Sequence, residues 1–542
     1  MKRFFGSIGV FFLLMVILIG CSGGGNVETG TGDEGADALD TGSGKHITIG
    51  ITNPPGAFNP IIRGDETAWY ISSILYSPLM QLNSDLEYVP TLASSIETED
   101  NQTFYVHLNQ EAVWTDGEPV TAEDVLFTAE MVGTEETGSI FAGITLLSGY
   151  DQAGNLEAPI EEIDGVKLID DHTVAFKTKA PVDLNLFNQQ LATQFKTIPK
   201  HIFGDVPPAE LAQHPAMQKP EVTNGPFKFV EHASNQYVEL EANPDSFLGE
   251  PKLDKLFFKI MPAANIVAQL QNGEVDMNFP GIGTIASSDY ERVENLSNVN
   301  TTFGPPLSYQ IFGFNHETIP DVRVRQAIIQ GINRQMIVDS LLKGNGEIND
   351  MVYSSESPYF YEGIINYEYD PEKAKALLEE ADWDSSQTIN FVVPSGNATR
   401  EQMADIVVQN LQEIGMKVEI EKFDIATAIA KSRSGEYDLF VLGYPFGLDP
   451  DTTSFYHTSG ASNTSFYSNP KVDELLEEGV AEVDPDKRKV IYNEVQEIIH
   501  EELPSIVLYY DTRLQAVSDR VLVGQPTDVG AFVNVHEWDV KE

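Results

Sequence analysis

The stretch INFVVPSGNATREQMADIVVQNLQEIGMKVEIEKF, residues 389–423, decides the fold class. Its two ends, 389–394 and 417–423, are short runs rich in β-branched residues, which is typical of strands. Residues 400–415 between them have a helical pattern, and Gly415 stands where such a helix would end. A strand, a helix and a second strand in this order indicate a parallel βαβ unit. We therefore expect a mixed α/β protein.

The same alternation of strands and helices extends over most of the chain. Further strands are expected at 46–51, 102–108, 172–178, 255–260, 438–444 and 505–510. Further helices are expected at 121–132, 263–273, 322–332, 370–381 and 486–502. Thr121 and Asp124 have the spacing of a capping box. With 542 residues the chain is too long for one core, so two or three domains are expected.

The first 25 residues, MKRFFGSIGVFFLLMVILIGCSGGG, have the pattern of a secretion signal. A short basic start precedes an apolar run that is marginal in length for a membrane span. The run ends at Cys21 in a sequence that resembles a bacterial lipobox, in which the cysteine is lipidated; an ordinary signal peptide with an incidental cysteine is the alternative. We expect a signal peptide at 1–20 and a lipidated flexible tether at 21–45.

Composition and charge exclude several kinds of function. The formal net charge is −50, which argues against nucleic acid as a partner because phosphates require a basic surface. Cys21 is the only cysteine, so neither a disulfide nor a cysteine–metal site is expected. The segment GSGK at 42–45 lacks the first glycine of a phosphate loop, since position 39 is Leu39. We therefore expect no ATP hydrolysis by this chain, and no metal or other cofactor.

No catalytic constellation emerges from the sequence. The ten histidines are scattered without an HExxH pair, and no GxSxG nucleophile elbow is present. The abundance of carboxylates makes any pairing by spacing uninformative. Two classes of function stay open at this point, a binding protein and a secreted hydrolase without a local motif.

Several blocks resemble one known family. PTLASSIETEDNQTFYVHLNQEAVWTDGEPVTAEDVLFT (90–128), TNGPFKFVEH (223–232) and YDLFVLGYPFGLDPD (437–451) are similar to segments of bacterial extracellular solute-binding proteins of the oligopeptide/dipeptide/nickel type. DVRVRQAIIQGINRQMIV (321–338) and other blocks follow in the family's order over nearly all of 46–510. The resemblance is closest to Gram-positive oligopeptide-binding lipoproteins. Within it, WTDGEP (114–119) is interpreted as turn chemistry rather than ligand contact.

The resemblance implies a periplasmic-binding-protein-like Venus flytrap with two lobes and an inserted extra domain. Lobe one is expected to be discontinuous, the insert lies within it, and the chain crosses between the lobes near 305–309 and 509–512. The expected boundaries are 46–81, 203–306 and 511–542 for lobe one, 82–202 for the inserted domain and 307–510 for lobe two.

The loop after the apolar strand in 437–451 is the first expected ligand contact, because ligands of open α/β sheets bind beyond the carboxyl ends of strands. Relatives carry an aromatic residue and an acid for the peptide's amino group in this loop. Here the acidic position falls near Phe446 or Gly447, so Asp449 or Asp451 is the substitute, or the amino group binds elsewhere; Asp449 is equally interpreted as turn chemistry. The candidates are Gly443, Tyr444, Phe446, Gly447, Asp449 and Asp451.

The opposite wall is expected from FNPIIRGDETAWY, residues 58–70. By resemblance, residues after the Asn-Pro pair line the cleft, which nominates Gly64, Asp65 and Glu66; a polar loop entering a helix is the alternative. Tyr309 and Asn315 lie near the expected crossover and are further candidates.

The family resemblance implies binding rather than catalysis. An oligopeptide would be captured outside the cell and delivered to the permease subunits of an ABC importer, by a monomer anchored through lipid to the outer face of the cytoplasmic membrane. Binding of dipeptides, nickel chelates or another small solute is the alternative on the same fold.

Overall fold

The structure is a computed structural model that describes residues 44–541, apart from 63, 140, 307, 446 and 526–529. The expected signal peptide, nearly all of the expected tether and Cys21 therefore lie outside the described residues. Residues 44–542 form one unit, built around three sheets of four or more strands.

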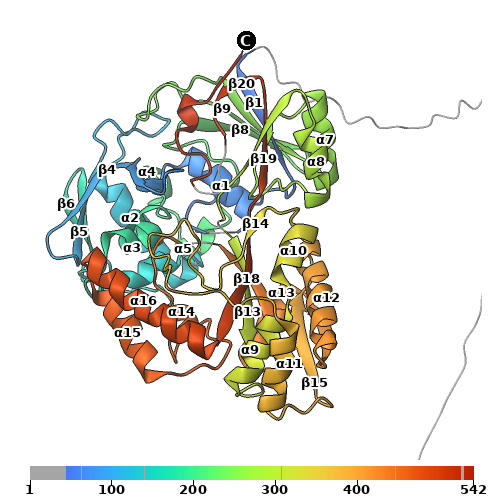
Figure 1. Cartoon of the computed structure of the whole chain (residues 1–542). Helices are drawn as coiled ribbons and strands as arrows, with labels where there is room; N and C mark the ends of the chain where they lie inside the picture. The colour runs from blue at the N-terminus through green and yellow to red at the C-terminus, as the bar shows by residue number, and fades with distance from the viewer. Residues whose placement is uncertain are drawn as a thin grey trace, which may run out of the picture. The chain divides into compact units, whose positions relative to one another are not determined.

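A seven-stranded sheet has the strand order β12-β19-β11-β1-β10-β9-β8. β1 pairs in parallel with β10 and β11, and five of its six residues are buried, as expected for a strand covered on both faces. Helix α1 packs on one face and α7 and α8 on the other (Figure 1). The elements are β1 (His46–Ile51), α1 (Glu66–Leu75), β8 (Phe227–Ala233), β9 (Tyr237–Ala242), β10 (Lys255–Ile260), α7 (Ala263–Asn272), β11 (Met277–Asn278), α8 (Tyr290–Glu294), β12 (Val299–Phe303) and β19 (Leu514–Ser518).

A four-stranded antiparallel sheet of order β4-β5-β7-β6 lies in the segment between α1 and β8. Its buried residues belong to the same apolar cluster as those around α1, so this segment has no separate core. Helix α2 begins with the predicted capping box of Thr121 and Asp124. The elements are β2 (Met80–Leu82), β3 (Tyr88–Pro90), β4 (Ala93–Thr98), β5 (Thr103–Leu108), α2 (Ala122–Gly133), β6 (Val166–Asp170), β7 (Thr173–Lys177), α3 (Leu184–Phe187), the short π-helix η3 (Asn188–Ala192), α4 (Lys200–Phe203), α5 (Pro208–Leu211) and α6 (Pro215–Gln218).

A six-stranded sheet has the order β14-β18-β13-β17-β15-β16. Apolar residues of α9 to α12 pack on one face of it and those of α13 to α16 on the other, which makes two separate clusters (Figure 1). Its elements are β13 (Ser308–Phe314), α9 (Val322–Gly331), α10 (Arg334–Leu341), β14 (Gly346–Glu347), α11 (Pro371–Glu380), β15 (Thr388–Pro394), α12 (Ala398–Glu413), β16 (Lys417–Phe423), α13 (Ile425–Ser434), β17 (Leu439–Pro445), α14 (Thr453–Tyr456), α15 (Pro470–Ala481), α16 (Pro485–Glu502) and β18 (Ser505–Asp511).

The βαβ unit expected at 389–423 is confirmed, since β15 and β16 pair in parallel and are joined by α12. β17 pairs in parallel with β15 on its other side. The other expected strands and helices are also present, with ends within two residues of the expected ones. Gly415 follows the helix with a φ of 90°, a left-handed conformation that favours glycine.

Two neighbouring strands carry the chain between the large sheets. β13 enters the six-stranded sheet after β12, and β18 leaves it just before β19. β13 and β18 pair antiparallel, with Ser308 opposite Asp511, and the Ser308 hydroxyl donates a hydrogen bond to that carboxylate. We propose the seven-stranded sheet as the centre of lobe one, the four-stranded sheet as that of the insert and the six-stranded sheet as that of lobe two, with the boundaries expected from the sequence.

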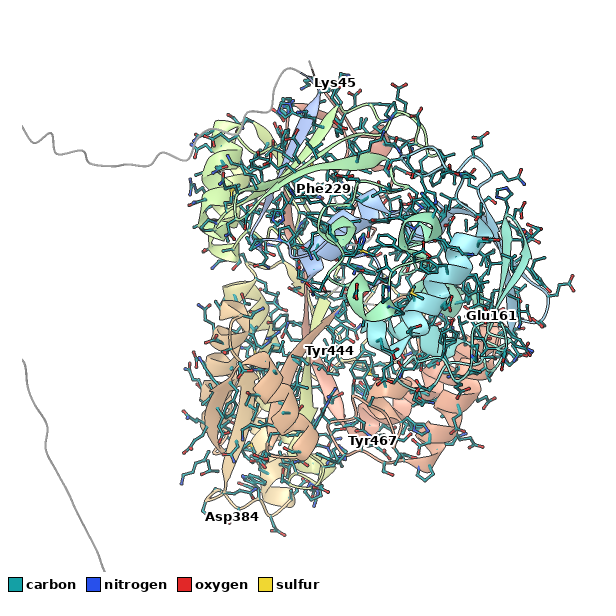
Figure 2. All side chains as sticks on the ribbon, turned by 180° about the vertical axis from the view of Figure 1, so that it is seen from behind. Lys45, Glu161, Phe229, Asp384, Tyr444 and Tyr467 are labelled. Atoms are coloured by element: carbon teal, nitrogen blue, oxygen red, sulfur yellow. The ribbon has the colours of Figure 1, made fainter. Side chains whose placement is uncertain are left out.

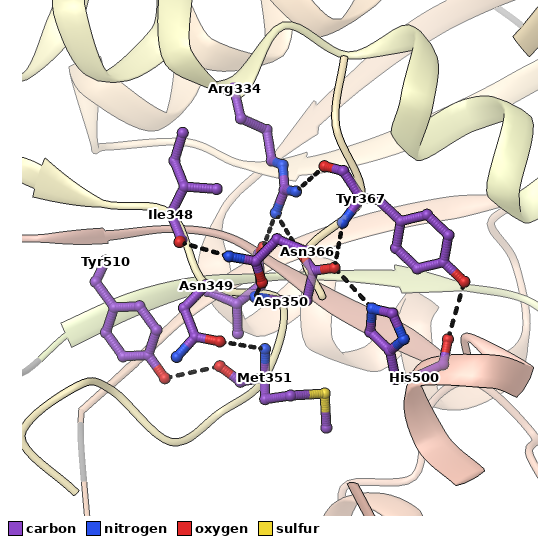
Figure 3. Close-up of polar contacts among 10 residues, drawn as sticks. Arg334, Ile348, Asn349, Asp350, Met351, Asn366, Tyr367, His500 and Tyr510 are labelled. Atoms are coloured by element: carbon purple, nitrogen blue, oxygen red, sulfur yellow. Dashed lines mark hydrogen bonds and ion pairs between the residues drawn. The ribbon is translucent and has the colours of Figure 1, made fainter. Parts of the chain in front are cut away.

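A buried polar network holds the segment between β14 and α11 against lobe two (Figure 3). The Asp350 carboxylate accepts hydrogen bonds from Arg334 Nη1 at 2.6 Å and from the Tyr367 N–H at 2.7 Å. His500 Nε2 lies 2.8 Å from Asp350 Oδ2, the oxygen that also accepts the Tyr367 N–H. This segment has little regular structure, so hydrogen bonds to side chains take the place of the backbone hydrogen bonds that a helix or strand would supply.

Candidate ligand-binding site

A cavity of about 350 Å³ lies where α1, the segment from β2 to η3, residues 530–532 and the loop after β17 meet. Its walls include the rings of Trp69, Tyr70 and Phe532 and the amide of Gln189, with Gly447 and Leu448 on the side of the six-stranded sheet. A concave, mostly apolar site with a few polar groups, formed between lobes, is the usual form of a ligand pocket. We call this space the cleft cavity.

Lobe two reaches the cleft cavity through the end of β17 and the loop after it. In Figure 2 Tyr444, near the end of β17, lies near the middle of the molecule, whereas Asp384, between α11 and β15, lies at the bottom. Pro445 and Gly447 line the cleft cavity, and Phe446 between them is outside the described residues. The carboxyl end of this strand therefore faces the cleft, where the sequence placed the ligand.

Gln189 of η3 joins the insert to this loop. Its side-chain oxygen accepts hydrogen bonds from the backbone N–H groups of Leu448, at 2.7 Å, and Asp449, at 2.9 Å. A Cβ on Gly447 would lie 3.1 Å from Gln189 Nε2, so a side chain at 447 would displace the amide. Gln189 thus lines the cleft cavity and also accepts hydrogen bonds from the loop after β17.

Asp449 is engaged by Arg488 of α16. Arg488 donates to both carboxylate oxygens, from Nη1 at 2.6 Å and from Nη2 at 3.1 Å, and both side chains are buried. Asp183 of the insert lies 3.8 Å from the same guanidinium. Burial by itself would lower the pKa of Arg488, but the hydrogen bond and charge of Asp449 outweigh it and raise the pKa. Asp449 therefore serves as an internal partner in this conformation.

Asp451 has a different setting. It is half-buried, and its Oδ1 accepts the Thr453 N–H at 2.9 Å at the start of α14. Its backbone N–H donates to Asp449 Oδ1 at 2.9 Å. Asp451 thus takes part in the turn of the loop, and among the described residues it has no ion-pair partner that would withdraw it from a ligand cation.

Tyr444 and Tyr309 stack across neighbouring strands, with ring centroids 6.1 Å apart. Tyr444 also meets Phe455 edge-to-face at 4.9 Å, and burial raises the pKa of its phenol. On the opposite face of the sheet, a Cβ on Gly443 would lie 2.8 Å from Gln310 Nε2 and 2.9 Å from Arg400 Nη2. Glycine at 443 therefore leaves room for the buried Arg400, which donates to Gln310 Oε1 at 2.9 Å.

Asn315 is buried away from the cleft cavity. Its side-chain amide donates to the carbonyl oxygens of Gly435 and Tyr437, at 3.2 and 2.8 Å. Its oxygen accepts the Glu317 N–H at 3.0 Å. These bonds stabilise the turn after β13, so Asn315 has a structural role.

The lobe-one candidates stand at the start of α1. Asp65 is its N-cap, with Oδ1 accepting the Ala68 N–H and Oδ2 the Gly56 N–H, each at 2.8 Å. Gly64 and Glu66, on either side, are exposed. This is the geometry of the alternative interpretation, a polar loop entering a helix. Ligand contact by these three residues stays a prediction.

Among the described candidates from the sequence Gly447 lines the cleft cavity, but most of the cavity wall comes from residues that were not expected. Trp69, Tyr70 and Ser73 lie further along α1 than the nominated residues, and Gln189 and Phe532 come from distant segments. Two adjacent aromatic residues in one expected helix start were the available signal for Trp69 and Tyr70. Nothing local marks Gln189, because only the tertiary fold brings η3 to the loop after β17.

The described residues contain no candidate for two other kinds of site, a membrane span and a metal centre. No helix among them is long and apolar enough to span a membrane. Within the same residues, no group of three or more histidine, cysteine or acidic side chains is placed to hold a metal ion.

Comparison with known proteins identifies related chains over nearly the whole length. Residues 87–466 match the model of bacterial extracellular solute-binding proteins, family 5 middle. The oligopeptide-binding protein AppA of Bacillus subtilis is 29% identical over 557 residues, covering 98% of this chain and 97% of that protein.

Solved structures agree with this match. The substrate-binding protein CtaP of an ABC transporter from Listeria monocytogenes superposes with a TM-score of 0.79 at 29% identity, over 92% of this chain and 100% of that chain. AppA of Bacillus subtilis, solved in complex with a nonapeptide, superposes with a TM-score of 0.74 at 26% identity, over 92% of this chain and 99% of that chain.

These matches confirm the expected fold class, an α/β Venus flytrap of the periplasmic-binding-protein kind with two lobes and an inserted domain. The relatives are solute-binding proteins rather than enzymes. The matched region covers more than half of the chain. The chain belongs to the bacterial extracellular solute-binding proteins of family 5.

Proposed function

We propose that this protein is the substrate-binding component of an ABC importer, which captures oligopeptides outside the cell and delivers them to a membrane permease. The observation that carries the proposal is the cleft cavity, to which lobe one, the insert and the loop after β17 all contribute walls. A relative of the same fold has been solved with a nonapeptide bound. The protein acts by binding and release, without a reaction.

The groups at the cleft suit a peptide backbone. Gln81, Gln189 and Gln194 supply amide donors and acceptors, and Trp69 and Tyr70 supply flat apolar surface. An extended peptide gains affinity from main-chain hydrogen bonds, as an added strand does, whereas side-chain pockets adjust its selectivity. Since every peptide shares the backbone, such a site accepts many sequences.

The partner of the peptide's amino group is proposed from geometry. Both oxygens of Asp449 accept hydrogen bonds from Arg488, whereas Asp451 forms no such pair with any described residue, so we favour Asp451 over Asp449. Oligopeptides are preferred to the alternatives, dipeptides or nickel chelates, because a relative of the same fold has been solved with a nonapeptide bound.

Mass spectrometry of ligand co-purified with the full-length chain, followed by calorimetry with synthetic peptides of two to nine residues, tests the proposal. We expect co-purified peptides and tighter binding for lengths above two. Tight binding of a nickel chelate or a sugar with no peptide bound would contradict it. Peptide cleavage during incubation would instead revive the remote alternative, a secreted hydrolase.

The anchor is a separate part of the proposal. Cys21 would carry lipid, and the Gly-rich residues after it would tether a monomer to the outer face of the cytoplasmic membrane, beside its permease. Cys21→Ser is expected to move the protein from the membrane fraction to the culture medium, as followed by immunoblotting. Retention of this variant in the membrane would contradict lipid anchoring and leave peptide binding unaffected.

A further inference from the structure

A second cavity, of about 270 Å³, lies beside the cleft cavity. Its walls come from the loop before α1, from α1 itself, and from three parts of the insert: α2, residues 141–143 and the segment 189–196. The apolar part of the wall consists of Pro60, Ile61, Trp69, Val132, Phe141 and Phe195. We call this space the side pocket.

Lining residues of the side pocket hold one another in place. The ammonium group of Lys196 lies 3.3 Å from the centroid of the Trp69 ring and donates to Trp69 O at 3.0 Å and to Ser72 Oγ at 2.8 Å. Phe195 is buried and meets Phe141 edge-to-face at 6.1 Å. These contacts fix the rings, so the pocket exists before a ligand arrives, which lowers the ordering cost of binding.

The side pocket adjoins the cleft cavity. Trp69, Gln189 and Gln194 line both spaces. On its other side Gln189 accepts the two backbone hydrogen bonds of the loop after β17. A ligand that occupies both spaces would therefore lie against Gln189, the residue through which the insert contacts lobe two.

We propose that the side pocket selects ligands by taking one large apolar side chain, aromatic or leucine-like, from a peptide held in the cleft cavity. The inference rests on the proposed function and specifies its substrate class. An apolar cavity of about 150 Å³ is already large enough to bind benzene, so about 270 Å³ holds an aromatic side chain. Rigid apolar walls favour such a group over alanine by roughly tenfold to a hundredfold in Kd.

Calorimetry with a positional scan tests the inference. The full-length chain is titrated with alanine–glycine host peptides of four to nine residues that carry a single Phe, Leu or Ala at each position in turn. We expect one position at which Phe or Leu binds at least about tenfold more tightly than Ala. Equal Kd values for all three residues at every position would overturn the side pocket while leaving peptide binding established. Binding of no peptide would overturn both proposals.

Two filling variants locate the preference. Ile61→Trp fills the pocket from the loop before α1, and Val132→Phe fills it from α2, so a folding defect of one leaves the other informative. Each is expected to abolish the preference for Phe. Ile169→Trp, at an exposed isoleucine of the insert, is the matched control and should retain the preference. If both filling variants fold and keep the full preference for Phe over Ala, the assignment of this preference to the side pocket is wrong.

Discussion

Two buried aspartate–arginine pairs of lobe two have nearly the same chemistry and different surroundings. Asp350 pairs with Arg334, and Asp449 with Arg488, each with a closest contact of 2.6 Å. All four side chains are buried. The first pair, however, is enclosed by residues of lobe two alone, whereas the second lies against the insert, 3.8 Å from Asp183.

A buried aspartate–arginine pair can therefore have two different roles. The Asp350 network bonds to Tyr367 and His500, so it fastens a loop to the lobe that contains it. The Asp449 pair orients a loop whose backbone is held by Gln189 across the cleft. Loss of the first should cost stability alone, whereas loss of the second should cost both stability and ligand affinity.

The largest effect is expected from Asp350→Ala. It leaves the guanidinium of Arg334 buried without its carboxylate, so the free energy of unfolding should fall by about 3–5 kcal/mol, as measured by urea denaturation. Peptide affinity of the folded protein should be unchanged. Asp339→Ala, at an exposed acid on α10, is the control, with a change within about 0.5 kcal/mol. A stability loss below about 1 kcal/mol in Asp350→Ala would show that the network does not fasten the loop.

Arg488→Met is expected to lower the free energy of unfolding by about 3 kcal/mol and to weaken peptide binding by about tenfold. The stability loss arises because Asp449 keeps its burial without a cation, and the affinity loss because the loop is no longer oriented. The double variant with Asp449→Leu should recover stability but not affinity. Arg433→Met, at an exposed arginine of α13, is the control. Unchanged affinity in Arg488→Met would remove the distinction between the two pairs.

The pH dependence of stability tests the interior of lobe two, at the half-buried His316. Burial, and then the charge of Arg325, lower the pKa of His316 from its ordinary value of 6.5 to about 4. The unfolded chain therefore binds this proton first, so stability is intact above about pH 6.5 and decreases as the pH falls from there to about 4. The loss is on the order of 2 kcal/mol after allowance for partial exposure. Urea denaturation at several pH values should show a smaller decrease for His316→Gln, and an identical decrease would refute the assignment.

The smallest effect is expected from Gln189→Ala. It removes the acceptor of two backbone hydrogen bonds at a border that water reaches when the lobes open, so stability should change by less than about 1 kcal/mol. Peptide dissociation should be about threefold to tenfold faster in stopped-flow experiments, because the closed state loses a contact. Gln152→Ala, at an exposed residue of the insert, serves as the control. An unchanged dissociation rate would mean that Gln189 does not hold the lobes together.

Local patterns were sufficient for the secondary structure and for the fold class. Apolar runs such as 389–394 and 417–423 became strands β15 and β16, and the capping box at Thr121 formed, since these features depend on neighbours within a few residues. The order of these elements was enough to indicate parallel pairing. The family resemblance, rather than the periodicity, supplied the lobes and the insert.

The site was less predictable because it joins distant segments. Asp449 has the spacing of turn chemistry in the sequence, and its partner Arg488 lies 39 residues away on helix α16. Gln189 meets Leu448 across a separation of 259 residues. Such contacts depend on the relative position of whole domains, which no local pattern encodes. The loop after β17 was located, but not the groups that line the cavity beside it.

The place of β19 in the seven-stranded sheet has a consequence for the order in which the protein is made. β19 lies between β12 and β11, so its residues 514–518 complete a sheet that begins with residue 46. Lobe two, by contrast, has every strand of its sheet between residues 308 and 511. During synthesis lobe two can fold while lobe one still has a gap within its sheet. Strand β1 is therefore synthesised more than 400 residues before β19, and the sheet of lobe one stays incomplete until residue 518 has been added.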